Sequence, residues 1–164
     1  MLRRATLVVA LALGTGAMAG EELPPVEVYG PEVCLACIDW TDHLRQNGFT
    51  ASFQGVPDMA AVKRRLGVPA DLESRLTAVV GGYFIEGHVP AEDIKQLLKE
   101  RPPARGLAVP GLPRGAPGFE KSAPFCERGC TILDAENTEP MVRREIYNTL
   151  LVEKNGKTRV WARH

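Results

Sequence analysis

Two cysteines stand at the start of a predicted helix, and this placement constrains the fold more than any other feature of the sequence. Val26 to Tyr29 is a short apolar strand, Gly30-Pro31 ends it, and Cys34 to Gln46 has its apolar residues at helical spacing. The pair Cys34-Leu35-Ala36-Cys37 therefore lies where the strand meets the helix. Unpaired N–H groups and the dipole at a helix start stabilise a thiolate at the first cysteine.

A thiolate at Cys34 suits two kinds of chemistry. It is the nucleophile of disulfide exchange, and it is a soft ligand for Cu(I). Cys37, one turn into the helix, would be the resolving thiol in exchange or the second ligand in metal binding. The alternative is a static local disulfide. Of the neighbouring side chains, Trp40 is expected in the core and His43 at the surface.

The segments after this helix complete an α/β pattern. Asn47-Gly48 ends the first helix, and a strand, a helix, a glycine-turned hairpin and a third helix follow. These are, in order, Thr50 to Val56, a helix starting at Pro57-Asp58, Thr77 to Val80 paired with Tyr83 to Glu86, and Pro90 to Pro102. The order β-α-β-α-β-β-α predicts a small mixed sheet with helices packed on it, which is the layout of a thioredoxin-like domain.

The first twenty residues indicate export. Arg3 and Arg4 form a basic start, an apolar run from Ala5 to Leu13 follows, and Ala17-Met18-Ala19 is the small-x-small pattern of a signal peptidase site. We expect a signal peptide over residues 1–19, cleaved after Ala19, and a single periplasmic domain over residues 20–164. A membrane anchor needs ~20 apolar residues. The run here is shorter, so no anchor is expected after cleavage.

Charge and compartment narrow the function classes. The 164 residues include 20 Lys plus Arg and 20 Asp plus Glu. Cleavage removes two arginines and no acid, so that 18 basic and 20 acidic residues remain, with a net charge of −2. This balance excludes a protein that binds nucleic acid by bulk electrostatics, because phosphate contacts need an excess of Lys and Arg. A cysteine in an exported chain is expected to be disulfide-bonded, redox-active or metal-bound.

The last third of the chain changes character. Pro and Gly recur over residues 102–124, and we interpret residues 102–145 as an irregular loop segment. A closing hairpin is predicted from Ile146 to Val152 and from Thr158 to Ala162. The Asn155-Gly156 pair between these strands suits a type I′ turn.

The loop segment carries a second cysteine pair, Cys126 and Cys130. In a helix the two sulfurs would share a face, whereas a loop would let them hold one Cu(I) or close a disulfide that pins the segment. A CxxxC pair is similar to that of the Sco-type copper chaperones, although here it lies outside their usual active-site position. Four cysteines allow three pairings. A zinc site made by all four is a further alternative.

Short motifs run through nearly all of the exported chain except about residues 121–145. They are Val26-Glu27-Val28-Tyr29, the first cysteine pair, Trp40-x-x-His43-Leu44, Asn47-Gly48-Phe49, Arg65-Leu66-Gly67-Val68-Pro69, Thr77-Ala78-Val79-Val80, Gly87-His88-Val89-Pro90, Arg105 to Gly111 and Ala162-Arg163-His164. Together they resemble the CopG-type periplasmic copper proteins, long regarded as a domain family of unknown function. The resemblance implies a thioredoxin-like fold and copper handling in the periplasm.

The chain departs from the CopG pattern at several copper ligands. The family has Cys-Gly-Cys-Cys where only the first and last thiols remain here, with Ala36 between them. A family Cys-His pair falls on Arg75-Leu76, and family methionines fall on Leu112 and Phe119. We therefore expect no multinuclear copper cluster. His88 matches a family histidine and is interpreted as a copper ligand or as a structural histidine beside a turn.

The sequence thus predicts a copper chaperone that receives Cu(I) and passes it to a cuproprotein. Cys34, Cys37, Cys126 and Cys130 are the expected ligands, with His88 as a further candidate. The resemblance extends to CopG-type proteins associated with a multicopper oxidase, which makes such an oxidase the expected recipient. The alternatives are a thiol-disulfide oxidoreductase acting through the CxxC, a dithiol that reduces Cu(II) to Cu(I), and an exported module with two inert disulfides. Leu76, where thioredoxin enzymes carry a cis-proline, disfavours efficient exchange on protein substrates.

Overall fold

The structure, a computed structural model, describes residues 22–118 and 145–164. The described strands are β1 (Val26–Gly30), β2 (Ala51–Gly55), β3 (Thr77–Val80), β4 (Tyr83–Glu86), β5 (Ala104–Ala108), β6 (Asn148–Glu153) and β7 (Thr158–Arg163). The helices are α1 (Leu35–Gln46), α2 (Met59–Leu66) and α3 (Ala91–Glu100), with a 3-10 turn, η1 (Ala70–Leu72). The predicted signal peptide and the pair Cys126 and Cys130 lie outside the described residues.

All seven strands join one sheet in the order β2-β1-β3-β4-β5-β6-β7. β1 runs parallel to β2 and β4 runs parallel to β5, while the other neighbours are antiparallel. The predicted α/β class and the order β-α-β-α-β-β-α from β1 to α3 are confirmed. The thioredoxin-like assignment stays a prediction.

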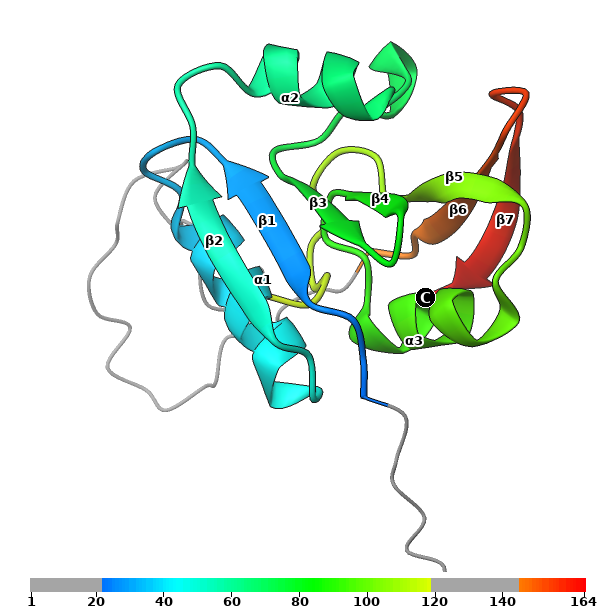
Figure 1. The fold of residues 1–164 in the computed structure, drawn as a ribbon, viewed down its shortest axis with the longest axis horizontal. Helices are drawn as coiled ribbons and strands as arrows, with labels where there is room; N and C mark the ends of the chain where they lie inside the picture. Colours follow the sequence, from blue (N-terminus) through cyan, green and yellow to red (C-terminus); the bar gives the residue numbers. More distant parts are fainter. Residues whose placement is uncertain (1–21, 119–144) are drawn as a thin grey trace, which may run out of the picture.

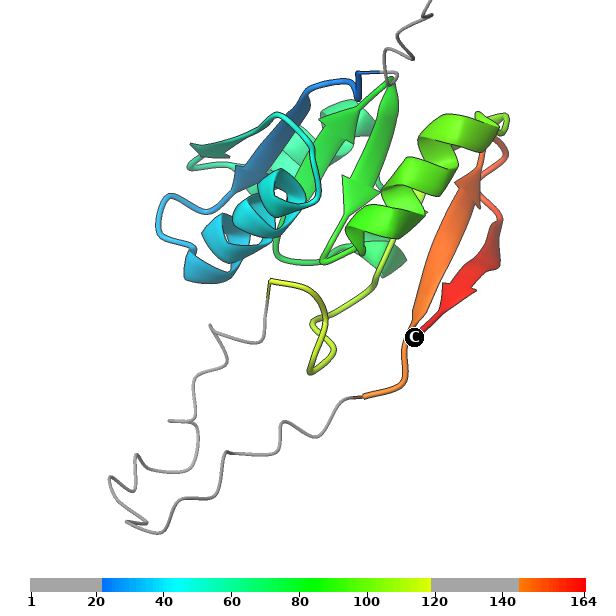
Figure 2. The same ribbon diagram turned by 90° about the horizontal axis from the view of Figure 1, so that it is seen from below.

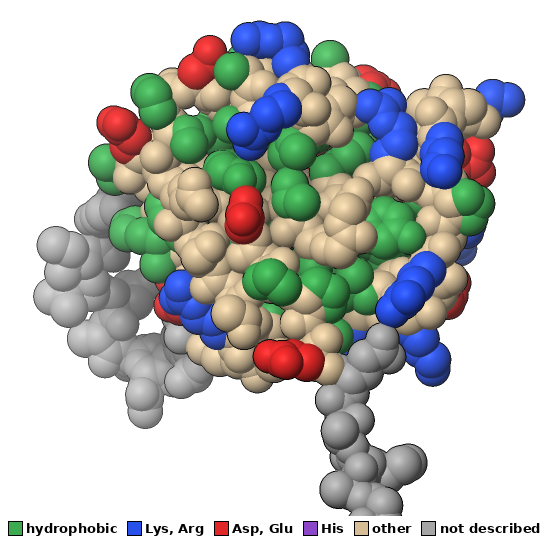
Figure 3. Space-filling model, in the orientation of Figure 1, with side chains coloured by type: hydrophobic (Ala, Val, Ile, Leu, Met, Phe, Trp, Pro, Cys, Tyr) green, Lys and Arg blue, Asp and Glu red, His purple; other side chains and the backbone are tan. Residues whose placement is uncertain are grey.

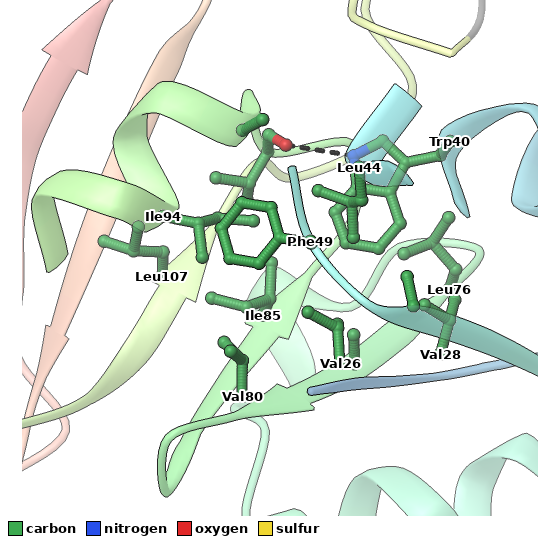
Figure 4. Close-up of a cluster of buried hydrophobic side chains, with 14 of the residues drawn as sticks. Val26, Val28, Trp40, Leu44, Phe49, Leu76, Val80, Ile85, Ile94 and Leu107 are labelled. Atoms are coloured by element: carbon green, nitrogen blue, oxygen red, sulfur yellow. Dashed lines mark hydrogen bonds between the residues drawn. The ribbon is translucent and has the colours of Figure 1, made fainter. Parts of the chain in front are cut away.

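Helices cover both faces of this sheet. α1 and α3 pack on one face and α2 on the other (Figure 1 and Figure 2). Alternate strand residues point to the α1 and α3 side, where Figure 4 shows Trp40 and Leu44 of α1 and Ile94 of α3 in one cluster with Val26 and Ile85. A smaller cluster lies on the other face and comprises Val68, Leu72, Phe84, Ala108 and Val152. Among the described residues, none of the helices is long and apolar enough to cross a membrane.

The ends of α2 follow from two capping residues. The Asp58 carboxylate accepts a hydrogen bond from the Ala61 N–H at 2.9 Å, which satisfies one of the free donors of the first turn. Gly67 ends the helix with a φ of +68°, a left-handed conformation that glycine adopts without steric cost. These caps limit α2 to a short helix, which lies above the C-terminal end of β1 and the start of β3 (Figure 1).

The prediction of an irregular segment from residue 102 is wrong at its start. Ala104–Ala108 form β5, which pairs with β4 in parallel and with β6 in antiparallel register. Leu107, Ala108 and Val109 are buried there, so this part of the segment supplies core side chains. The Pro and Gly content concealed the strand because Pro102-Pro103 and Pro110 flank it and leave its interior free of proline.

The prediction of a type I′ turn in the closing hairpin is also wrong. A type I′ turn needs a positive φ at both central residues. Gly156 has a φ of +85°, whereas Arg101 is the residue other than glycine with a positive φ in the described part of the chain. The Gly156 N–H donates to the Glu153 carbonyl and the Glu153 N–H to the Lys157 carbonyl, both at 2.9 Å. The connection is therefore a longer loop that ends in a left-handed glycine.

Candidate functional site

The first cysteine pair caps α1. Cys34 is the N-cap residue, and its sulfur accepts a hydrogen bond from the Cys37 N–H at 3.2 Å. Cys34 and Cys37 form a disulfide with a Cα–Cα distance of 5.2 Å. Both residues are buried, with Cys34 4% exposed and Cys37 0% exposed. The position of the pair at the helix start and the deeper burial of Cys37 agree with the sequence, while the nucleophilic or metal-binding role of the pair stays a prediction.

The end of β1 makes room for the second sulfur. A Cβ placed on Gly30 would lie 2.7 Å from the Cys37 sulfur and 3.0 Å from a ring carbon of Phe53. Real Cβ atoms essentially never show a contact of 2.7 Å, and 3.0 Å is tighter than most of their contacts, so a side chain at this position would displace the sulfur and press on the ring. Glycine at the end of the strand is thus part of the site, because it allows α1 to place Cys37 against the backbone of the sheet.

Three apolar residues next to the cysteine pair in the sequence are exposed. Val33 is 88% exposed, Leu35 is 71% exposed and Ile38 is 41% exposed. They belong to the loop before α1 and to the outer side of its first turn. Such a group of exposed apolar residues next to the cysteine pair is suited to contact with another molecule.

His88 lies inside the protein. It is buried, its Nδ1 is 3.1 Å from the Pro117 carbonyl oxygen, and its ring meets Trp40 edge-on at 6.4 Å between centroids. This geometry agrees with the structural interpretation of His88, and its role as a copper ligand stays a prediction. Trp40 is a core residue, as predicted, and its indole N–H donates to the Val89 carbonyl at 2.9 Å.

The prediction of a surface position for His43 is wrong. Its side chain is half-buried, and its Nε2 accepts a hydrogen bond from the Ala91 N–H at 3.2 Å. Ala91 is the first residue of α3, so His43 satisfies a free donor at that helix start and ties α1 to α3. Sequence spacing did not indicate this role, because the two residues are far apart in the chain and meet only through the packing of the helices.

A buried ion pair lies on the α2 side of the sheet and was not predicted. Lys63 of α2 pairs with Glu86 of β4, and both side chains are almost completely buried. The Glu86 carboxylate also accepts hydrogen bonds from the Ser74 N–H at 2.5 Å and from the Thr77 hydroxyl at 2.6 Å. Burial raises the pKa of Glu86, and the hydrogen bonds from Lys63 and Thr77 oppose that increase. The ion pair thus links α2 to the β3–β4 hairpin.

An open pocket of about 460 Å³ lies beside this ion pair. Its lining residues are Pro31, Met59, Lys63, Ser74, Arg75, Gly111 and Leu112. Arg75 and Leu112 are two of the positions at which the sequence departs from the copper ligands of the CopG pattern, and the fold brings them together here. Figure 3 shows other Lys and Arg side chains gathered over α2. Leu76, next to Arg75, is buried in the same core cluster as the two cysteines.

Among the described residues, Cys34 and Cys37 are the two candidate metal ligands that are in contact with each other. Residues 22–118 and 145–164 hold no group of three or more His, Cys, Asp or Glu side chains placed to bind a metal ion. Two sulfurs at a helix start fit the linear, two-coordinate binding that Cu(I) accepts from thiolates. Cys126 and Cys130 lie outside the described residues.

The same fold occurs in solved structures of known proteins. Two of them, copper resistance protein copG in form 1 and in form 2, each share 36% sequence identity with this chain and superpose with a TM-score of 0.71. The match covers 87% of this chain, and 98% and 99% of those chains. The chain belongs to the CopG family. The CopG relationship agrees with the resemblance found in the sequence.

Two further comparisons gave matches. Residues 72–119 match a family described as protein of unknown function, DUF411. The chain is also 27% identical over 112 residues to one of the polypeptides of the aspartyl/glutamyl-tRNA(Asn/Gln) amidotransferase of Borrelia turicatae. The chain spans 22% of the length of that curated relative, which is too small a part to carry its activity over.

Proposed function

We propose that this CopG-family protein is a periplasmic copper chaperone that binds Cu(I) and delivers it to a cuproprotein such as a multicopper oxidase. The observation that carries the proposal is the contact between Cys34 and Cys37 at the start of α1 in a chain related to copper resistance proteins. Once reduced, this pair offers two soft thiolate ligands at the point where the helix dipole stabilises negative charge. Cys126 and Cys130 are proposed as a second thiolate pair.

Transfer proceeds by ligand exchange. A two-coordinate Cu(I) has open coordination positions, so a thiolate or thioether of the recipient can bind before a cysteine of the chaperone leaves. The exposed side chains of Val33, Leu35 and Ile38 offer a surface on which a recipient can dock while its ligand approaches Cys34. Cys37 is fully buried and Cys34 is 4% exposed, so we expect the incoming ligand to meet Cys34 first.

The proposal is tested by Cu(I) titration of the reduced mature protein against a competing chromophoric Cu(I) chelator. We compare the parent with Cys34→Ser/Cys37→Ser and with Cys126→Ser/Cys130→Ser, so that each double variant serves as the control for the other pair. Each variant is expected to lose one class of Cu(I) site and to keep the other. If neither double variant changes the affinity or the number of Cu(I) ions bound, the proposal is wrong.

A periplasmic location is part of the same proposal and has its own test. Protein isolated from the periplasmic fraction should have a mass that corresponds to a chain beginning at Gly20, as expected for cleavage after Ala19. A full-length mass in that fraction, or recovery only from the cytoplasm, would contradict it.

A thiol-disulfide oxidoreductase, or a dithiol that reduces Cu(II) to Cu(I), is the second candidate. The observation in its favour is the disulfide itself, in which Cys34 is 4% exposed and Cys37 is fully buried. If this activity operates, Cys37→Ser expressed in the periplasm should accumulate mixed disulfides through Cys34. Cys34→Ser is the matched control and should accumulate none. Equal trapping by both variants would speak against this activity.

A further inference from the structure

β7 forms an open edge of the sheet. Among the described strands it lies last in the order and pairs with β6 alone. The Glu153 N–H donates to the Lys157 carbonyl at 2.9 Å where the hairpin turns. Bonded and non-bonded pairs alternate along an antiparallel ladder, so the N–H and C=O groups of Thr158 and Val160 point away from β6. These backbone groups are placed to pair with one more strand.

The same edge carries unmatched positive charge. Residues 154–164 include no Asp or Glu and four cations, which are Lys154, Lys157, Arg159 and Arg163. All four are exposed, and none forms an ion pair with another described residue. The Arg159 guanidinium lies over the ring of the half-buried Trp161, 5.5 Å from its centroid. Since acidic and basic residues are equal in number over the whole chain, this excess is a local property of the edge.

The opposite edge of the sheet lacks this combination. β2 is the other terminal strand, and its residues Ala51–Gly55 carry no charge. Its first carbonyl, that of Ala51, already accepts a hydrogen bond from Arg45 Nε at 2.9 Å. A second copy of β7 is also a poor match for β7, because pairing two copies would bring the cations of one strand against those of the other.

We propose that the β7 edge docks an extended acidic segment of another protein, which adds to the sheet as a further strand. The backbone of the segment pairs with the outward groups of Thr158 and Val160, and its carboxylates meet Arg159 and Arg163. The backbone edge favours a peptide strand over an anionic lipid or a nucleic acid, because neither of these offers a matching row of donors and acceptors. This docking does not require copper, so it is tested independently of the chaperone proposal.

The probe is a fluorescein-labelled peptide, Thr-Glu-Val-Glu-Val-Glu-Thr, and its counterpart with Gln in place of every Glu. Fluorescence anisotropy measures the binding of each peptide to the oxidised mature protein. We expect the acidic peptide to bind at least about tenfold more tightly than the Gln peptide, because the Gln peptide forms no ion pairs. On binding, the amide hydrogens of Thr158 and Val160 should exchange more slowly.

Charge reversal on the edge is compared with the same reversal elsewhere. Arg159→Glu/Arg163→Glu should weaken binding of the acidic peptide by about tenfold or more. Arg64→Glu/Arg75→Glu is the matched control, because both arginines are exposed on the α2 side and the net charge changes equally. This control should stay within about twofold of the parent.

A change at Val160 tests the backbone part of the proposal without altering charge. Val160→Pro removes an outward N–H that β6 does not use, and it should weaken binding by about three- to tenfold. Val160→Thr keeps the N–H and the branched side chain and should bind like the parent. Thermal unfolding checks that both variants fold, and if Val160→Pro does not, amide exchange in the parent decides.

Three results would overturn the inference. Charged side chains on an edge strand can serve only to prevent pairing with another sheet, and failure of the acidic peptide to bind would leave them that role. An equal loss in the two charge-reversed variants would show that net charge alone attracts the peptide. Normal binding by a folded Val160→Pro, or unprotected amides of Thr158 and Val160, would reduce the contact to electrostatics without strand addition.

Discussion

The buried pair of Lys63 and Glu86 allows the sharpest test of the architecture around the site. Replacing Lys63 with Met keeps the length of the aliphatic chain and removes the cation that faces Glu86. Breaking a buried ion pair from one side costs about 3–5 kcal/mol, because the remaining charge is left in a medium that solvates it poorly. Glu86 keeps the donors from Ser74 and Thr77, so we expect a loss near the lower end, about 3 kcal/mol of the free energy of unfolding at neutral pH.

The same change predicts a pH dependence with a defined sign. Burial raises the pKa of Glu86 above its ordinary value of 4.5, and removing Lys63 takes away a charge that opposes this increase. A group whose pKa is raised in the folded state contributes stability below the pKa of the unfolded chain and loses it as the pH rises through the folded pKa. The deficit of Lys63→Met should therefore be smallest near pH 4 and should grow towards pH 8.

Urea unfolding followed by tryptophan fluorescence measures this deficit across that pH range. Arg64→Met is the matched control on the same helix, because the Arg64 side chain is 71% exposed and its contact with Asp58 is 4.0 Å long. We expect this control to lose less than about 0.5 kcal/mol. Lys63→Met/Glu86→Gln should recover part of the loss, since it removes both charges and keeps an acceptor for Ser74. A deficit below about 1 kcal/mol, or one that does not grow with pH, would refute the reasoning.

Three further predictions concern the core and the closing hairpin. Gly30→Ala should lower the free energy of unfolding by about 1–3 kcal/mol. The loss should be clearly smaller in a Cys37→Ala background, which removes the sulfur, and an equal loss in both backgrounds would contradict the close approach of Gly30 to Cys37. Trp40→Phe should cost about 1–3 kcal/mol in urea unfolding, because it leaves a buried carbonyl without its donor, and a neutral result would show that water replaces the indole. Thr149→Val removes the hydroxyl that donates to Asp93 at 2.5 Å and should speed amide hydrogen exchange in β6 and β7, with α1 as the internal control.

The order of elements up to α3 could be predicted because its signals are local. Each of these signals sets a boundary within a few residues of itself. They are the glycines at the ends of β1 and α1, Asp58 before α2 and the Gly81-Gly82 turn, and the structure confirms those boundaries. β5 was missed because its surroundings are rich in Pro and Gly. Its stability comes from β4 and β6 on either side, and no pattern within five residues reports such partners.

The site also has one part that could be predicted from the sequence and another that could not. The CxxC at the start of α1 was evident, since both the spacing and the helix start are properties of one short segment. His43 and Glu86 acquire their contacts only from residues far along the chain, so their types alone did not indicate these contacts. Two features of the sequence are weak signals of the ion pair. Glu86 is a polar residue at the end of β4, and Lys63 lies on the face of α2 that packs on the sheet.

By itself the sequence determined that two thiols stand at a helix start in an α/β domain with copper-family motifs, because capping, turn formation and CxxC spacing act over a few residues. The tertiary structure decided how those thiols are presented. It buried Cys37 against Gly30, placed Arg75 and Leu112 beside Pro31 in one pocket, and set Glu86 under Lys63. These contacts depend on strand order and helix packing, which bring together residues that are separated by tens of positions and whose desolvation is settled only when the core closes.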